Sequence, residues 1–265
     1  MGLTRAQFTQ AEAAEASQLR MTQLQRLSYR ELQQLLTGDP ERAAVWIRSA
    51  AECGLVAAQL RLGRLLLEGT GVAPDAAAAL DWFRRAAAQG DAEALNMVGR
   101  CLENGWGTGV DLVRAAAHYE ASARRGYDWG EYNFGNMLFD GRGLPGNRRL
   151  ALYWYQRAAR QGHGRAMNLL GRCLEEGWGC DPDQAAAALW YARSAETGYF
   201  RGQFNHAAVL AQHGNAAAAA AWYRQAAAGG DRAIRGAIVT ALANSVDPDL
   251  QAARAAVAAL LLQAP

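Results

Sequence analysis

The four histidines and four cysteines of this 265-residue chain are the first candidates for metal binding or nucleophilic chemistry. His163 falls in an expected turn, while His206 and His213 lie seven residues apart on an expected helix. None of them has a cysteine, aspartate or glutamate partner at a metal-ligand spacing, so we expect no metal site. No Ser/His/Asp or Cys/His arrangement can be singled out. We therefore predict that the chain is not an enzyme and uses no cofactor.

Arginine supplies all of the basic charge, with 27 basic residues against 25 acidic ones and no lysine. This absence of lysine, with abundant alanine, is typical of a GC-rich bacterial genome. So balanced a charge does not predict a nucleic-acid-binding domain. The loops Gly69-Thr70-Gly71 and Gly105-Trp106-Gly107 lack the lysine of a phosphate-binding loop. Arginine instead offers a planar fork that pairs with carboxylates and stacks on aromatic rings.

Glycines at a spacing of 36 residues define the elements that would position these side chains. The three columns are Gly54, Gly90, Gly126, Gly162 and Gly198; Gly63, Gly99, Gly135 and Gly171; and Gly69, Gly105, Gly141 and Gly177. Three columns in one phase predict an internal repeat. Each copy is expected to be a hairpin of two helices, A and B.

Helix B is predicted to begin at an aspartate or asparagine, whose side chain accepts from the free backbone N–H groups of the first turn. This column is Asp39, Asp75, Asp111, Asn147 and Asp183, followed after a shortened 32-residue step by Asn215 and Asp247. Two bulky columns follow it: Trp46, Trp82, His118, Trp154, Trp190 and Trp222, then Ile47, Phe83, Tyr119, Tyr155, Tyr191 and Tyr223. The first glycine column ends helix B in a left-handed conformation.

Helix A is interrupted by the second glycine column, and a glycine inside a helix lowers its stability. We expect the compensation to be a close approach by the aromatic residue of helix B. The third glycine column then ends helix A.

These columns resemble the Sel1-like repeat, a relative of the tetratricopeptide family. The third copy carries the pattern as Ala94, Val98-Gly99, Gly105-Trp106-Gly107, Asp111, Ala115, Tyr119 and Gly126. The resemblance implies an all-α, right-handed solenoid of about seven helix-turn-helix repeats, whose concave wall consists mainly of A helices. It implies a role in assembling other proteins and no chemistry.

The expected organisation is an N-terminal polar helix or arm, a solenoid and a C-terminal capping hairpin. The arm covers residues 1–18, the solenoid 19–230 and the cap 231–265, with hairpins at 19–54, 55–90, 91–126, 127–162, 163–198 and 199–230. Degenerate terminal repeats are typical of caps, and Arg254 stands where the last repeat would have tryptophan.

Alternate hairpins are also alike, at a spacing of 72 residues. Residues 100–107 nearly reappear as residues 172–179, and Asn96 matches Asn168. Duplication of a two-hairpin unit explains the likeness. Two interpretations remain open: ancestry alone keeps the pairs alike, or like surfaces recur at every second hairpin and bind an extended partner.

The side of helix A opposite its apolar columns is the predicted binding strip. Its candidate residues are Arg64, Asn96, Arg100, Glu103, Tyr132, Asn136, Phe139, Asn168, Arg172, Glu175 and Phe204. Asparagine, arginine and aromatic residues of this kind are enriched at interfaces. The asparagines could bind a peptide backbone, and the arginines could hold its carboxylates. The alternative is an ordinary surface or packing between helices.

Trp106 and Trp178 are the second candidate site, because each stands between two loop glycines. Each indole either contacts a partner or folds back on the next hairpin.

The cysteines and the N-terminal residues indicate the cellular compartment of the protein. Residues 1–17 lack an apolar signal segment, and the chain has no run of about 18 apolar residues. Cys101 and Cys173 fall in core columns too far apart for a disulfide, and a Cys173–Cys180 bridge is not favoured. We expect reduced thiols and a cytoplasmic location.

Together these features predict an adaptor that binds another protein or a peptide in the groove of A helices. The alternatives are an accessory protein that docks on an enzyme or transport system through Trp106 and Trp178, and an effector delivered into a host cell. We expect no nucleic-acid or membrane partner, and a monomer or weak homodimer.

Overall fold

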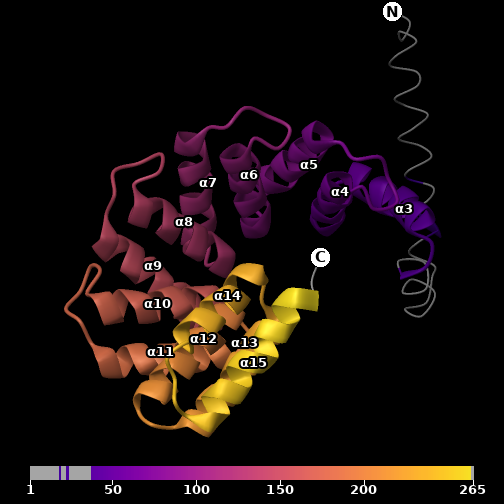
Figure 1. The fold of residues 1–265 in the computed structure, drawn as a ribbon. Coiled ribbons are helices and arrows are strands. Elements are labelled where there is room, and N and C mark those ends of the chain that lie inside the picture. The colour runs from indigo at the N-terminus through magenta and orange to yellow at the C-terminus, as the bar shows by residue number, and fades with distance from the viewer. Residues whose placement is uncertain (1–17, 19–21, 24–36, 264–265) are drawn as a thin grey trace, which may run out of the picture. The chain divides into compact units, whose positions relative to one another are not determined.

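The computed structural model describes residues 18, 22–23 and 37–263, which form helices and turns without strands (Figure 1). In chain order the labelled helices are α3 (Pro40–Glu52), α4 (Val56–Glu68), α5 (Ala76–Ala88), α6 (Ala92–Asn104), α7 (Leu112–Arg124), α8 (Asp128–Asp140), α9 (Arg148–Arg160), α10 (Gly164–Glu176), α11 (Gln184–Glu196), α12 (Phe200–Gln212), α13 (Ala216–Gly229), α14 (Arg232–Ala241) and α15 (Pro248–Gln263). Most of the expected arm and the first A helix lie outside the described residues.

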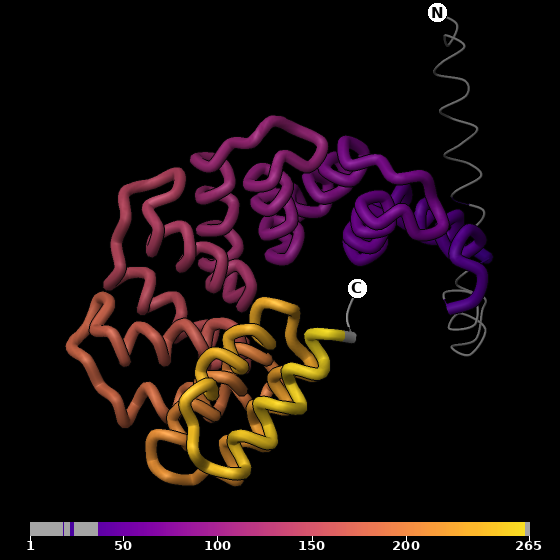
Figure 2. Tube along the Cα trace, in the orientation of Figure 1, coloured from indigo at the N-terminus to yellow at the C-terminus, as the bar shows by residue number. Residues whose placement is uncertain are grey.

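The chain divides into two compact units, which we call unit 1 (Met1–Gly126) and unit 2 (Tyr127–Pro265). In unit 1, α4 packs on α5 and α6 on α7, with α3 against α4. In unit 2, α8 packs on α9, α10 on α11 and α12 on α13. Figure 2 shows the two helices of each of these pairs side by side, joined by a loop. Both units are therefore built as an all-α solenoid of helical hairpins.

N-caps begin the B helices largely as predicted. Asp75 Oδ1 accepts from the Ala78 N–H at 2.9 Å, and the equivalent bond recurs at Asp111, Asn147 and Asp183. The prediction is wrong for Asn215, whose side chain makes no cap hydrogen bond. Its ψ of 67° departs from the extended conformation of the other caps, and the 32-residue step has removed four loop residues here.

The second glycine column lets the two helices of a hairpin touch. A Cβ on Gly135 would lie 2.6 Å from Tyr155 Cε1, and one on Gly171 would lie 2.7 Å from Tyr191 Cδ1. Gly99 stands in the same relation to Tyr119. The predicted close approach is confirmed, and the second of the two bulky columns makes it.

A separate cluster closes the C-terminal end of unit 2. Tyr223 of α13, Ile238 of α14 and Val257 of α15 are buried together with a set of alanines. Helix α15 packs along α13 as well as on α14, which Figure 2 shows in yellow and orange. No helix in the described part of the chain combines the length and apolar character that a membrane span needs.

Candidate partner-binding site

The asparagines of the predicted strip do not face solvent. Asn96 is 3% exposed and Asn168 is 4% exposed. Asn168 Oδ1 accepts a hydrogen bond of 2.8 Å from Asn205 Nδ2 on α12. Helices α10 and α12 pack against each other, so Asn168 lies at their boundary rather than on a free face. The exposure expected for both asparagines is therefore wrong, and a direct contact with a peptide backbone loses its support.

Three other strip residues accept hydrogen bonds from buried tyrosines. Tyr119 donates to Glu103 Oε2 and Tyr191 donates to Glu175 Oε2, each at 2.6 Å. In the intervening hairpin Phe139 occupies the glutamate position, and the Tyr155 hydroxyl donates to Asn136 Oδ1 at 2.9 Å. These side chains fix helix A to helix B.

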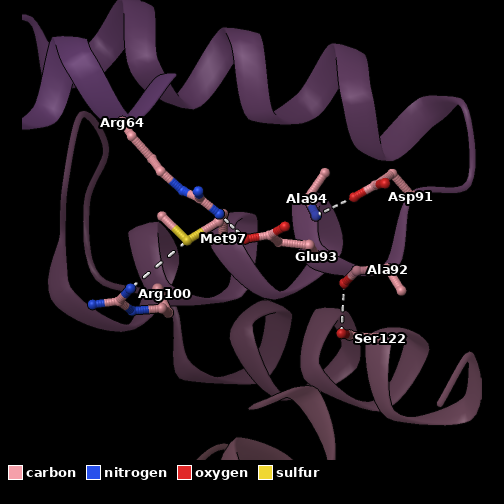
Figure 3. Close-up of polar contacts among 8 residues, drawn as sticks. All are labelled: Arg64, Asp91, Ala92, Glu93, Ala94, Met97, Arg100 and Ser122. Carbon is pink, nitrogen blue, oxygen red and sulfur yellow. Dashed lines mark hydrogen bonds and ion pairs between the residues drawn. The ribbon is translucent and has the colours of Figure 1, made fainter. Parts of the chain in front are cut away.

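Arg64 reaches a neighbouring A helix. Figure 3 shows its guanidinium extending from α4 to Glu93 on α6, with which it forms an ion pair. The Arg64 side chain is 36% exposed, and its charge is balanced within unit 1. Arg64 is therefore a weaker candidate for holding a partner's carboxylate than the sequence suggested.

The aromatic strip residues Tyr132 and Phe204 pack within unit 2. Tyr132 stacks on His163 with ring centroids 4.8 Å apart, and Phe204 meets Tyr223 edge-on at 5.7 Å. His163, which we had placed in a turn, is the N-cap of α10: its Nδ1 accepts from the Ala166 N–H at 3.1 Å. Burial lowers the pKa of His163, which keeps the ring neutral and able to accept.

The two candidate sites of the sequence meet in the structure. The Arg100 guanidinium carbon lies 5.1 Å from the centroid of the Trp106 ring, and Arg172 lies 5.1 Å from Trp178 in the same way. Both arginines are exposed and both indoles are half-buried. Arg100 also donates to Met97 Sδ (Figure 3). Each indole folds back onto its own helix A, where it supports an arginine at the surface.

Unit 2 adds two residues to this arrangement. Phe139 lies 5.3 Å from Trp178 between ring centroids, and the Arg148 guanidinium lies 5.1 Å from Phe139 and 6.0 Å from Trp178. We call Phe139, Arg148, Arg172 and Trp178 the Trp178 cluster. Arg148 escaped the sequence prediction because it belongs to helix B. The signal that could have found it is the pair Arg148-Arg149 after a cap that is asparagine rather than aspartate.

Comparison with known families decides what these hairpins are. The model of the Sel1 repeat matches residues 25–55, 56–91, 92–127, 130–163, 164–199 and 198–231. The chain belongs to the Sel1 repeat family. Sel1 repeat proteins typically mediate protein–protein interactions, and the repeat is generally a non-enzymatic fold. Among curated proteins, none matches the chain.

Solved structures of Sel1 repeat proteins share the fold. A Sel1 repeat protein from Oxalobacter formigenes is 27% identical, with a TM-score of 0.69, covering 84% of this chain and 93% of that one. The protective antigen c5321 of uropathogenic Escherichia coli, which displays an SLR fold, is 26% identical with a TM-score of 0.70. The match covers 88% of this chain and 53% of c5321, so the chain spans about half of that protein. The immunity protein Pa5087 from Pseudomonas aeruginosa, 16% identical over 78% of this chain and 81% of its own, shows the fold alone (TM-score 0.52).

A buried carboxylate distinguishes one Sel1 repeat of unit 2. The Glu131 side chain is 0% exposed, and its Oε1 lies 2.9 Å from Arg157 Nε. Gln161 Nε2 donates to Glu131 Oε2 at 2.8 Å. Burial raises the pKa of Glu131, while Arg157 and Gln161 oppose the rise. The partners are those of an internal support between helix A and helix B of one hairpin, because 72 residues earlier Gln89 donates to Gln59 in the same way.

The thiols of these Sel1 repeats are packing groups. Cys101 and Cys173 are buried and free, and Cys180 is also free. Burial raises the pKa of Cys101 to about 11 and that of Cys173 to about 12. Both thiols therefore stay protonated at neutral pH and are poor nucleophiles. Across the described residues, no three His, Cys, Asp or Glu side chains are grouped to hold a metal ion.

A cavity of about 590 Å³ lies between α9 and the loop after Trp178. It is lined by Arg149, Leu152, Tyr153, Gln156, Gly179, Cys180 and Asp181. Arg149 and Asp181 give it one charge of each sign, and the raised pKa of Cys180 leaves its thiol protonated. These residues suit contact with a partner side chain better than a covalent reaction.

Proposed function

We propose that the chain is a non-enzymatic scaffold that binds a partner protein or peptide segment at the ends of its A helices. The observation that carries this proposal is the recurrence of one arrangement in both units. In each, an exposed arginine lies over a half-buried loop tryptophan, as Arg100 over Trp106 and Arg172 over Trp178.

Stacking on an indole suits an arginine for recognition. The ring covers one face of the guanidinium and limits its motion, while the N–H groups at the edge stay free to donate. Arginine and tryptophan are also the residue types most often found to dominate interface energies. The Tyr119–Glu103 and Tyr191–Glu175 hydrogen bonds hold the helix that carries each arginine.

This surface combines the two interpretations of the sequence. An adaptor that grips a peptide and an accessory protein that docks through its tryptophans would use the same residues, and they would differ in the partner. The four free cysteines support a reducing compartment, which we propose is the cytoplasm.

The test is quantitative capture of partners by the immobilised chain, with mass spectrometry as the readout. The double variant Arg100→Glu/Arg172→Glu should lose the proteins that the unchanged chain enriches, since charge reversal repels the groups that arginine attracts. The matched control is Arg42→Glu/Arg160→Glu, which reverses one exposed arginine on a B helix of each unit. Helical content by circular dichroism should stay the same in both. Equal capture by the two double variants would contradict the proposed surface.

A further inference from the structure

The Trp178 cluster holds two guanidinium groups on one indole. The guanidinium carbons of Arg172 and Arg148 lie 5.1 Å and 6.0 Å from the Trp178 ring, and both charges act on the pKa of Cys173. Two cations beside one ring add their positive potentials, which attract an anion. Among the described residues, neither arginine forms an ion pair with a carboxylate.

The backbone fixes this arrangement. Gly177 ends α10 with a φ of 69°, and the Trp178 N–H donates to the Cys173 carbonyl at 2.8 Å. A Cβ on Gly179 would lie 2.6 Å from the carbonyl oxygen of Arg148. Only glycine lets the loop approach the start of α9 so closely. Trp178 and Arg148 are therefore held in place relative to each other before any ligand arrives.

The start of α9 adds to the positive potential. Acidic residues are favourable in the first turn of a helix, because the helix dipole is positive there. Helix α9 instead begins with Arg148 and Arg149, after the neutral cap Asn147. Of the nearby acids, Glu175 accepts from Tyr191, Asp183 caps α11, and Asp140, Glu176 and Asp181 are exposed. Among the described contacts, none of these acids forms an ion pair with Arg148 or Arg172.

We propose that the Trp178 cluster binds an acidic segment of the partner protein, with Asp or Glu carboxylates against Arg148 and Arg172. This inference rests on the proposed function and names the chemistry of its partner. The equivalents of Phe139 and Arg148 in unit 1 are Leu67 and Ala76, so Trp106 carries a single arginine. The acidic part of the partner therefore binds unit 2, and the Arg100–Trp106 pair makes the weaker contact.

Selection from a library of random 12-residue peptides displayed on phage tests the proposal without a known partner. Peptides enriched on the full chain should contain two or more Asp or Glu residues, and fluorescence anisotropy should show that their affinity falls as salt rises. The same selection on Arg148→Ala/Arg172→Ala should not enrich them. Enrichment of neutral or basic peptides, or of none, would overturn the proposal.

The variants separate the cluster from general charge. Arg148→Ala/Arg172→Ala should bind the selected peptide at least about tenfold more weakly, because hydrogen bonds between charged groups are lost. Arg160→Ala/Arg224→Ala removes the same charge from exposed positions on α9 and α13 and should change affinity less than about threefold. Arg148→Lys/Arg172→Lys keeps the charge without the planar fork and should bind about fivefold more weakly. Affinity equal to that of the unchanged chain in the lysine variant would contradict the stacked geometry.

Two further arms keep the outcomes distinct. A version of the selected peptide with phosphoserine in place of one glutamate should bind no more than about threefold more tightly, whereas a gain above tenfold would replace the acidic segment with a phosphorylated one. If Arg148→Ala/Arg172→Ala still captures the same proteins in the affinity experiment, the cluster is wrong and the scaffold stands. If the unchanged chain captures no protein, the scaffold is wrong whatever the peptides do.

Discussion

The two units use arginine differently on the same hairpin frame. In unit 1, Arg64, Arg84, Arg114 and Arg124 pair with carboxylates. In unit 2, most arginine contacts are with aromatic rings, made by Arg148, Arg157, Arg165, Arg172, Arg193 and Arg201. An ion pair neutralises the charge that it positions, whereas a ring positions a charge and leaves it unneutralised. Unit 2 therefore presents more arginine charge that is positioned by an aromatic ring and not neutralised by a carboxylate.

Composition explains much of this difference. Unit 1 holds as many acidic residues as arginines, while unit 2 holds more arginines than acids and most of the chain's aromatic residues. In the ion pair described for unit 2, between Arg157 and Glu131, the carboxylate is buried and the arginine is partly exposed. In unit 1, neutral Gln59 stands at the position of Glu131 and bonds to Gln89, the equivalent of Gln161. The comparison predicts where charge matters for stability and where it does not.

Removing Arg157 should have the largest effect. Arg157→Ala leaves Glu131 as a buried carboxylate without its cation, and we expect about 3 kcal/mol less stability at pH 8. Glu131→Gln copies the unit 1 arrangement and should cost less than about 1 kcal/mol. Chemical denaturation followed by circular dichroism measures both, and faster hydrogen exchange in α8 and α9 would localise the loss.

The pH dependence of Arg157→Ala gives a second readout. Burial raises the pKa of Glu131 in the folded chain above its unfolded value, so the folded state binds this proton more readily and stability falls as pH rises between the two values. Without Arg157 the folded pKa rises further, and the stability deficit of the variant should shrink as pH falls from 8 towards 5. In Glu131→Gln this dependence should be absent. A deficit that stays constant with pH would mean that Glu131 is not the group left unpaired.

The glycine column should behave alike in both units, because they share the frame. Gly99→Ala in unit 1 and Gly135→Ala in unit 2 each push a methyl group into a buried tyrosine ring, and overpacking of this kind costs about 2 kcal/mol. Gly236→Ala, on the helix α14, meets nothing within 4 Å and should gain up to about 1 kcal/mol. Thermal denaturation of the three variants tests this. A cost in one unit only would show that the hairpins are not equivalent.

Sequence periodicity predicted the hairpin frame, meaning the starts, ends and contacts of the helices, because each repeated glycine or cap position has to meet one local geometric requirement. Positive φ at Gly90 or Gly162 and the contact of Gly171 with Tyr191 follow from local rules. The candidate strip was harder to predict, because exposure depends on how consecutive A helices pack. Asn96 and Asn168 occupy positions that a single helix leaves open, and their neighbours in the solenoid bury them.

The 72-residue likeness has a partly structural explanation. Ser122 donates to the Ala92 carbonyl and Ser194 to the Gly164 carbonyl, at 2.6 Å and 2.7 Å. Such matched internal hydrogen bonds explain why the same residues recur, and this explanation requires no partner protein. The Arg–Trp pairs differ from them, because each arginine is exposed. Arg148 joins its cluster through a contact between two hairpins, which periodicity within one repeat does not reveal.

The smallest predicted effects pair hairpins across the two units. Tyr119→Phe in unit 1 and Tyr191→Phe in unit 2 each remove a donor to a glutamate, and we expect each to cost about 1.5 kcal/mol, because a hydrogen bond to a charged group is lost. Tyr155→Phe removes a donor to neutral Asn136 and should cost about half as much. Urea denaturation of the three variants, at equal protein concentration, compares them directly. If Tyr191→Phe matched Tyr155→Phe rather than Tyr119→Phe, stability would follow the unit rather than the alternate hairpin, and the structural explanation of the 72-residue likeness would fail.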